Sequence, residues 1–260
     1  MDHGDKMSIK KMLFFMTIAV WVTVFSSVSA YAGTDVKTLF AEGNAYYETG
    51  DYEKAVEAYE KILKEGYESG NVYYNLGDAY FKKGDLGRAV LNYERAELII
   101  PRDSDLAANL RFVEEKIKGN RKDPVVSIWN WMPLRTYERS LTANELSLSA
   151  SALYVLMVIM LFGAVAMPGN RRKFLVISVI LLLLSLVTTA VLSHKVSGNK
   201  AVIVGSETEA LFSPFDSGTK FFTLYEGMVC SVLENKDDWY KVRREDGKVG
   251  WIKKEALEII

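Results

Sequence analysis

The chain has 260 residues, of which 32 are Lys or Arg and 33 are Asp or Glu, so its formal net charge is −1. Residues 33–122 carry 14 basic and 17 acidic side chains, and residues 198–260 carry 9 and 11, which excludes a basic footprint for nucleic acid in either region. The single cysteine, Cys230, excludes an intramolecular disulfide, and its apolar neighbours predict a small buried side chain.

Residues 1–32 have the pattern of a secretory signal peptide. Lys10 and Lys11 precede the apolar run MLFFMTIAVWVTVF, and small residues follow it. The run is short for a membrane span, and cleavage after Ala30 and cleavage after Ala32 both fit the small residues at its end. An uncleaved N-terminal anchor is the alternative interpretation.

The next region repeats itself with a period of 34 residues. A match of small and aromatic residues at this period indicates a helix–turn–helix repeat. The matching pairs are Gly43 and Gly77, Tyr46 and Tyr80, Gly50 and Gly84, Asp51 and Asp85, Ala55 and Ala89, and Tyr59 and Tyr93.

These matches predict how the helices of each repeat meet. Gly43 and Gly77, facing Ala55 and Ala89, allow close approach of paired helices. The four matched tyrosines are expected to fill the space between helices. Each Gly-Asp pair predicts a turn, in which Gly ends one helix and Asp caps the next.

Residues 36–103 resemble the tetratricopeptide repeat family, with repeats at 36–69 and 70–103. The resemblance implies antiparallel helix pairs, and a further helix at 104–118 is expected to cap the second repeat, because two repeats alone are marginal. The whole repeat domain is predicted to span residues 33–122.

The resemblance places a concave groove on the first helix of each pair. Some members of the family clamp a peptide carboxylate there, but the basic positions of that clamp hold Phe40, Asp105 and Asn109, so a terminal carboxylate is not the expected ligand. The expected partner-binding residues are Asn44, Tyr47, Tyr74, Asn75, Asp78, Phe81 and Asn109, with Phe40, Glu48, Lys82 and Phe112 beside them. The alternative is a groove that holds only water.

Two apolar segments without charged residues follow, at 146–167 and 174–193, each near the roughly 20 residues that cross a bilayer. The loop at 168–173 carries Arg171, Arg172 and Lys173. This cluster predicts a cytoplasmic loop and therefore both soluble regions outside the cytoplasm. The linker at 123–145 contains Trp129 and Trp131. We expect these tryptophans at the membrane interface, and packing on the repeat domain is the alternative.

Residues 199–260 consist of short β-type runs separated by Gly, Asp and Pro, which predicts a small barrel. They resemble the bacterial SH3-like family at Trp239 to Val242, at Asp246-Gly247 and at Gly250 to Ile252. Asp246-Gly247 supplies a hairpin turn, and Gly250 stands where a side chain would collide. Barrels of this kind bind peptides or cell-wall fragments, so Tyr225, Trp239 and Tyr240 form a candidate ligand face. Burial of Trp239 in the core is the alternative.

No metal-binding, phosphate-binding or nucleophile motif is present in the sequence, so we expect no enzymatic activity, no cofactor and no metal site. The fold class expected for the whole chain is multidomain: helical repeats, a transmembrane hairpin of two helices, and an SH3-like β-barrel.

The order of these parts resembles the BatE proteins of the Bacteroides aerotolerance group. That resemblance implies a scaffold in the inner membrane with both soluble domains in the periplasm, acting in aerotolerance or envelope stress. The partners it implies are other envelope proteins, including membrane proteins with von Willebrand A domains and a MoxR-type ATPase system. A protein that binds or senses peptidoglycan through the barrel is the alternative function.

Overall fold

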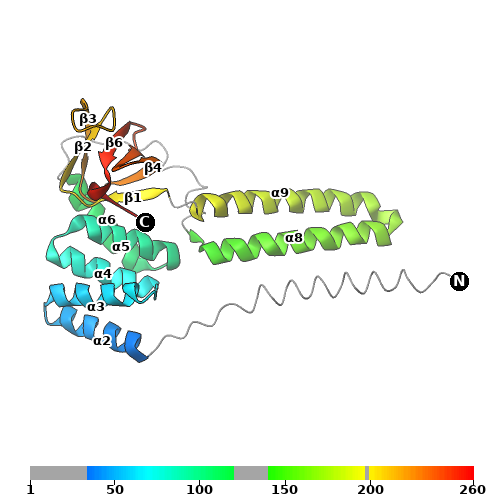
Figure 1. Cartoon of the computed structure of the whole chain (residues 1–260). Helices are drawn as coiled ribbons and strands as arrows, with labels where there is room; N and C mark the ends of the chain where they lie inside the picture. The colour runs from blue at the N-terminus through cyan, green and yellow to red at the C-terminus, as the bar shows by residue number, and fades with distance from the viewer. Residues whose placement is uncertain (1–33, 120–139, 197–198) are drawn as a thin grey trace. The chain divides into compact units, whose positions relative to one another are not determined.

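The structure is a computed structural model that describes residues 34–119, 140–196 and 199–260 (Figure 1). The predicted signal peptide and the tryptophans of the linker lie outside these residues. The described helices before the hairpin are α2 (Thr34–Glu48), α3 (Tyr52–Lys64), α4 (Gly70–Lys83), α5 (Leu86–Ile99) and α6 (Ser104–Gly119).

The repeat region contains the predicted antiparallel helix pairs, α2 with α3 and α4 with α5. Gly84 ends α4 in the left-handed conformation with φ of 87°, and Asp85 then accepts a hydrogen bond from the Arg88 backbone N–H at 2.9 Å. Gly50, with φ of 81°, and Asp51 do the same between α2 and α3. The turn prediction is therefore confirmed in both repeats.

The helices of each pair touch at the predicted glycines. A Cβ atom on Gly77 would lie 2.7 Å from the Tyr93 ring, and one on Gly43 would lie 2.6 Å from the Tyr59 ring. Both tyrosines are buried, so no space is left for a side chain at either glycine.

Tyr46 differs from the prediction, because its side chain is exposed while that of its equivalent, Tyr80, is buried. The Tyr80 hydroxyl donates a hydrogen bond to Glu60, which belongs to the preceding repeat. The part of the chain that the structure describes contains no repeat before α2, so Tyr46 has no such neighbour to cover it.

Helix α6 packs against α5 and covers the end of the repeat array, as predicted for a cap. Its buried residues, Leu106, Leu110, Val113 and Ile117, recur at the spacing of one helical face.

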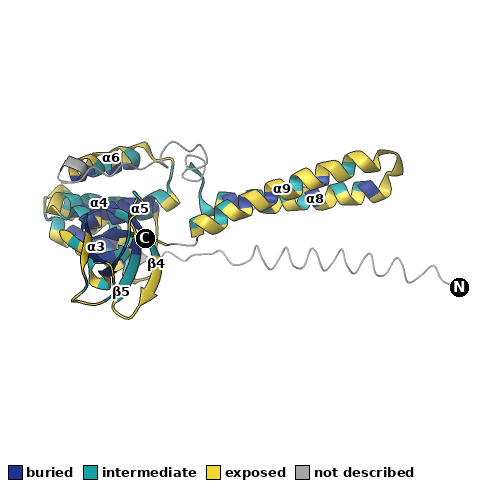
Figure 2. Ribbon diagram, turned by 90° about the horizontal axis from the view of Figure 1, so that it is seen from above, coloured by how far each residue is buried: buried dark blue, intermediate teal, exposed yellow. Residues whose placement is uncertain are grey.

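Two long helices form the hairpin, α8 (Ala143–Ala166) and α9 (Arg171–Val196), joined by the short 3₁₀ turn η1 (Pro168–Asn170). Each is long and apolar enough to cross a membrane. The helices meet along a narrow strip, where the Ser185 hydroxyl donates to the Ala150 carbonyl at 3.2 Å. Figure 2 shows most of the remaining hairpin surface exposed, although its side chains are largely Leu, Ile and Val. Such a surface is suited to lipid rather than to water.

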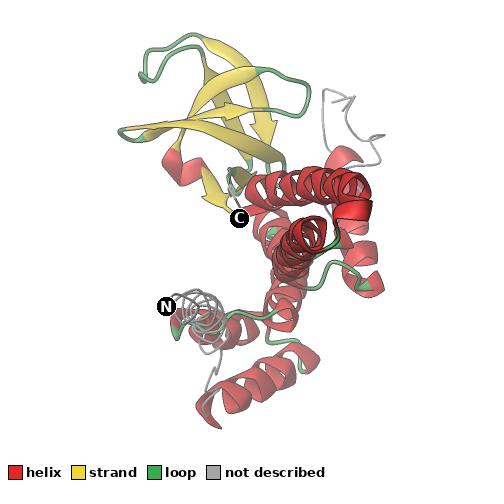
Figure 3. Cartoon of the chain, turned by 90° about the vertical axis from the view of Figure 1, so that its right-hand side faces the viewer, coloured by secondary structure: helices red, strands yellow, loops and turns green. Residues whose placement is uncertain are grey.

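The C-terminal residues form a curved antiparallel sheet with the order β3-β2-β6-β5-β4-β1-β7 (Figure 3). The strands are β1 (Lys200–Ile203), β2 (Glu207–Leu211), β3 (Lys220–Tyr225), β4 (Val229–Lys236), β5 (Trp239–Arg243), β6 (Val249–Lys253) and β7 (Leu257–Ile259), with the 3₁₀ turn η2 (Lys254–Ala256) before β7. We refer to this sheet as the barrel.

The barrel encloses an apolar core that includes Ile203, Leu224, Met228, Val242 and Ile252. Cys230 belongs to this core, as expected, and Trp251 is also buried. Gly247 adopts φ of 88° in the predicted hairpin turn. A Cβ atom on Gly250 would lie 3.0 Å from both Ala210 and Phe222, which confirms the predicted close approach.

Candidate functional site

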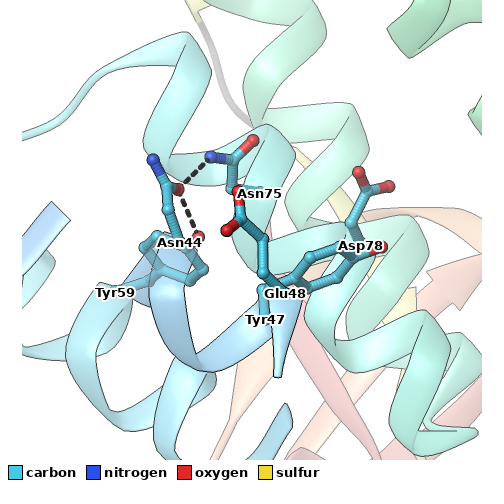
Figure 4. A pocket seen from close by; sticks show the side chains of 6 residues that line it. All are labelled: Asn44, Tyr47, Glu48, Tyr59, Asn75 and Asp78. Carbon is cyan, nitrogen blue, oxygen red and sulfur yellow. Dashed lines mark hydrogen bonds between the residues drawn. The ribbon is translucent and has the colours of Figure 1, made fainter. Parts of the chain in front are cut away.

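A cavity of about 220 Å³ opens between the first helices of the two repeats (Figure 4). We call it the groove pocket, and it is lined by Asn44, Tyr47, Glu48, Tyr59, Asn75 and Asp78. Four of the seven residues expected to bind a partner, Asn44, Tyr47, Asn75 and Asp78, therefore surround one cavity.

The wall of the groove pocket is built by hydrogen bonds centred on Asn44. Its Oδ1 atom accepts from the Tyr59 hydroxyl at 2.7 Å and from the Asn75 Nδ2 atom at 3.0 Å, as the dashed lines in Figure 4 show. Tyr59 belongs to the second helix of the same repeat, and Asn75 belongs to the first helix of the next. Asn44 thus joins three helices.

The same arrangement recurs one repeat later, centred on Asp78. Its Oδ1 atom accepts from the Tyr93 hydroxyl and, at 3.0 Å, from the Asn109 Nδ2 atom. Each member of this second set lies 34 residues after its counterpart in the first. We call the two sets the polar ladder, because they connect α2, α4 and α6 in turn.

The polar ladder determines which atoms remain available to a ligand. The Asn44 Oδ1 atom accepts from two donors, and its Nδ2 atom is turned outward (Figure 4). Within the described residues, Asn44 Nδ2, Asn75 Oδ1 and Asp78 Oδ2 make no hydrogen bond. The groove pocket therefore offers an amide donor, an amide acceptor and a carboxylate oxygen, and the amide pair suits an extended peptide backbone.

Burial shifts the ionisation of the groups along this wall. Desolvation raises the pKa of Asp78, and the hydrogen bonds from Tyr93 and Asn109 partly oppose that shift. Desolvation also raises the pKa of Tyr59 and of Tyr74 to about 12, so both phenols stay neutral at physiological pH. Asp78 and the exposed Glu48 are the two carboxylates that line the pocket.

The remaining predicted groove residues lie around the second half of the polar ladder. The Tyr74 hydroxyl accepts a hydrogen bond from Asn109 Nδ2 at 3.0 Å. The ring of Phe81 meets that of Phe112 edge-on at 5.8 Å between centroids, and the Lys116 ammonium lies 5.2 Å from the Phe81 centroid. Phe81 thus presents an aromatic surface at the α6 side of the groove.

Tyr59 was expected only to fill space between helices, yet its hydroxyl contributes to the pocket wall. The sequence contains the signal for this role, since the Asn44–Tyr59 spacing of 15 residues recurs at Asp78–Tyr93.

The three aromatic residues proposed for the barrel do not share one setting. Tyr225 and Tyr240 are partly buried against the barrel core. Trp239 is also half-buried, and the Lys253 ammonium lies 5.7 Å from its ring centroid. Trp239 and Tyr240 are consecutive in β5, so their side chains point to opposite faces of the sheet.

Two protein-family models match the chain. Residues 40–106 match a tetratricopeptide repeat model, and residues 220–258 match a bacterial SH3 domain model. A search of the curated proteins finds no match. The chain therefore combines tetratricopeptide repeats, two apolar helices able to span a membrane, and a bacterial SH3 domain.

Proposed function

We propose that the protein is a membrane-anchored adaptor that binds a segment of a partner protein in the groove pocket. The observation that carries this proposal is the polar ladder, which turns Asn44 Nδ2 and Asn75 Oδ1 toward the open groove. A donor and an acceptor on adjacent helices can pair with one peptide group of an extended segment. Tyr47 supplies aromatic contact area beside them.

The charges of the groove pocket favour a partner segment that carries Lys or Arg. Glu48 and Asp78 contribute carboxylates to a pocket lining that also contains Tyr47, an arrangement that suits a cationic side chain. Lys82 lies close enough to act on Asp78, so the attraction is concentrated at the Glu48 end. A free carboxylate would meet repulsion there.

The hairpin supports anchoring of this adaptor in a membrane. Both helices expose apolar side chains over most of their surface, and three basic residues, Arg171 to Lys173, begin α9. That cluster supports a cytoplasmic turn, with the repeat domain and the barrel on the opposite side. In a cell with an inner membrane and a periplasm, both would be periplasmic, as in the BatE proteins that the chain resembles.

By the same resemblance, the partners would be envelope proteins of an aerotolerance or stress complex, such as membrane proteins with von Willebrand A domains that act with a MoxR-type ATPase. Because the sequence contains no metal-binding, phosphate-binding or nucleophile motif, we propose an adaptor and not an enzyme. Binding of peptidoglycan by the barrel is the second candidate, supported by the half-buried Trp239 with Lys253 beside it.

Site-specific photocrosslinking in the native membrane tests the proposal. A photoreactive amino acid at Glu48, on the rim of the groove pocket, should form an adduct with a partner protein. The same amino acid at Lys61, exposed on α3, serves as the matched control and should form none. Equal adducts from both positions would contradict binding in the groove.

A further inference from the structure

Helix α5 is buried on a face that the equivalent helix α3 leaves open. Residues 87, 91 and 94 follow the spacing of one helical face, and each lies 34 residues after its counterpart at 53, 57 and 60. In repeat one the first two positions are exposed glutamates and the third is a half-buried one. In repeat two all three are buried, with exposed fractions of 1% for Leu91 and 4% for Glu94, and Gly87 replaces a glutamate.

The barrel lies against the beginning of this face. The Gly87 backbone N–H donates a hydrogen bond to the Glu226 Oε1 atom at 2.8 Å. A Cβ atom on Gly87 would lie 2.9 Å from the Ile203 carbonyl oxygen and 2.9 Å from the Val204 Cα atom. Only glycine permits this approach, because the neighbouring atoms belong to the barrel backbone and cannot rotate away.

Two arginines extend the contact along the helix. The Arg88 Nε atom lies 3.3 Å from Glu258 Oε1, and Arg95 Nη2 donates to the Ile259 carbonyl at 2.7 Å. Arg88 and Arg95 are two turns apart on α5, and their side chains reach the successive β7 residues Glu258 and Ile259. The contact therefore runs along α5 rather than touching it at one point.

A second glycine, on the barrel side, closes the contact with α6. Gly227 adopts φ of 74°, and a Cβ atom there would lie 2.2 Å from Ile117 Cδ1 and 3.5 Å from Val90 Cγ2. The contact thus requires glycine at position 87 on the repeat side and at position 227 on the barrel side. Residues 39–260 form one compact unit, to which both surfaces belong.

We propose that the barrel is a fixed part of the repeat domain. It docks, through β1, β7 and the turn at 226–228, on the face of α5 that begins at Gly87. None of the contacting residues lines the groove pocket, so docking leaves that pocket open. Because the barrel follows the hairpin and the repeats precede it, docking requires both to lie on the same side of the membrane. It also removes the β1–β7 edge of the barrel from the surfaces that could meet a cell-wall ligand.

Cross-linking of the full chain in detergent micelles tests this proposal. Arg88→Cys together with Glu258→Cys places one thiol on each side of the contact. A short bis-maleimide should then join α5 to β7 within one chain. Adding Gly87→Glu, which gives repeat two the residue that repeat one carries at position 53, should abolish the cross-link. Adding Glu57→Gln on the exposed face of α3 is the matched control and should leave it unchanged.

Glu226→Ala provides a second variant that changes no residue of the repeat helices. It should lower the yield of the cross-link while the helical circular dichroism stays constant. If Gly87→Glu reduces helical content, the Glu226→Ala result decides, and a yield equal to that of the parent overturns the proposal. A cross-link that survives Gly87→Glu in a folded protein overturns it too. So does a product formed only between two chains, which would assign the contact to separate copies.

Discussion

Replacing Gly77 with Leu tests the packing on which the repeat domain depends. The Cβ atom would lie 2.7 Å from two atoms of the Tyr93 ring and 3.3 Å from the Ala89 carbonyl oxygen. The Tyr93 ring cannot swing aside freely, because it is almost fully buried and its hydroxyl donates to Asp78. The substitution therefore forces α4 and α5 apart.

The two contributions to the change in stability have opposite signs. Replacing glycine inside a helix gains about 0.5–1 kcal/mol. Overpacking a filled core costs about 1–3 kcal/mol, and the upper end applies here because Leu adds three carbons beyond the Cβ atom that already collides. We expect a net loss of about 2 kcal/mol, which corresponds to roughly 30-fold faster amide exchange through the opened state.

Hydrogen exchange read by mass spectrometry on peptides from α4 and α5 measures this loss in the full chain. Gly77→Ala should show a smaller loss of protection, since the Cβ atom alone meets the ring. Ala45→Leu, which introduces the same side chain at an exposed position of α2, is the control and should change little. Unchanged protection in α4 and α5 after Gly77→Leu would refute the packing described here.

Three further predictions address the membrane topology and the barrel. Alkaline phosphatase fused after Lys122 or after Ile260 should be active and a fusion at Asn170 inactive, whereas activity at Asn170 alone would invert the topology. The hydrogen bond from Arg244 lowers the pKa of Asp246, so the pair should stabilise the barrel above about pH 4 and lose its effect as the pH falls. Asp246→Asn should make the free energy of unfolding, followed by tryptophan fluorescence, depend less on pH in the acid range, and should lower it by about 1–3 kcal/mol at neutral pH. An unchanged pH dependence would contradict the pairing. Burial raises the pKa of Cys230 to about 12, so its thiol should react with maleimide only after unfolding, and rapid labelling of the folded chain would count against a closed core.

Much of the fold was predictable because its signals are local and periodic. Gly84 with Asp85 determines a turn through backbone conformation and capping, and the period of 34 residues identifies Gly43 and Gly77 as points of close helix approach. The exposed Tyr46 was missed because its burial depends on a preceding repeat rather than on its own helix.

The candidate site was predictable in its residues but not in its bonding. Asn44, Asn75 and Asp78 were assigned to the groove from the positions of the family. The polar ladder also needs Tyr59 from another helix, and hydrogen-bond direction cannot be read from spacing alone. The sequence does indicate the docking face of α5, since repeat two has Gly87 and Leu91 where repeat one has glutamates. This difference predicts that the face is covered, but it does not identify the covering segment, which lies more than 100 residues away in the chain.

The central claim is that the groove pocket, rather than the barrel, recognises a protein partner. The most direct measurement is the dissociation constant of the partner cross-linked through Glu48, determined for the full chain and for two variants. Tyr47→Ala with Glu48→Ala removes contact area and charge from the pocket without breaking the polar ladder. It should weaken binding by about 2 kcal/mol or more, roughly 30-fold, as for loss of an aromatic hot spot. Trp239→Ala in the barrel should leave the dissociation constant unchanged. An unchanged constant for the pocket variant together with weaker binding for Trp239→Ala would contradict the account and assign recognition to the barrel.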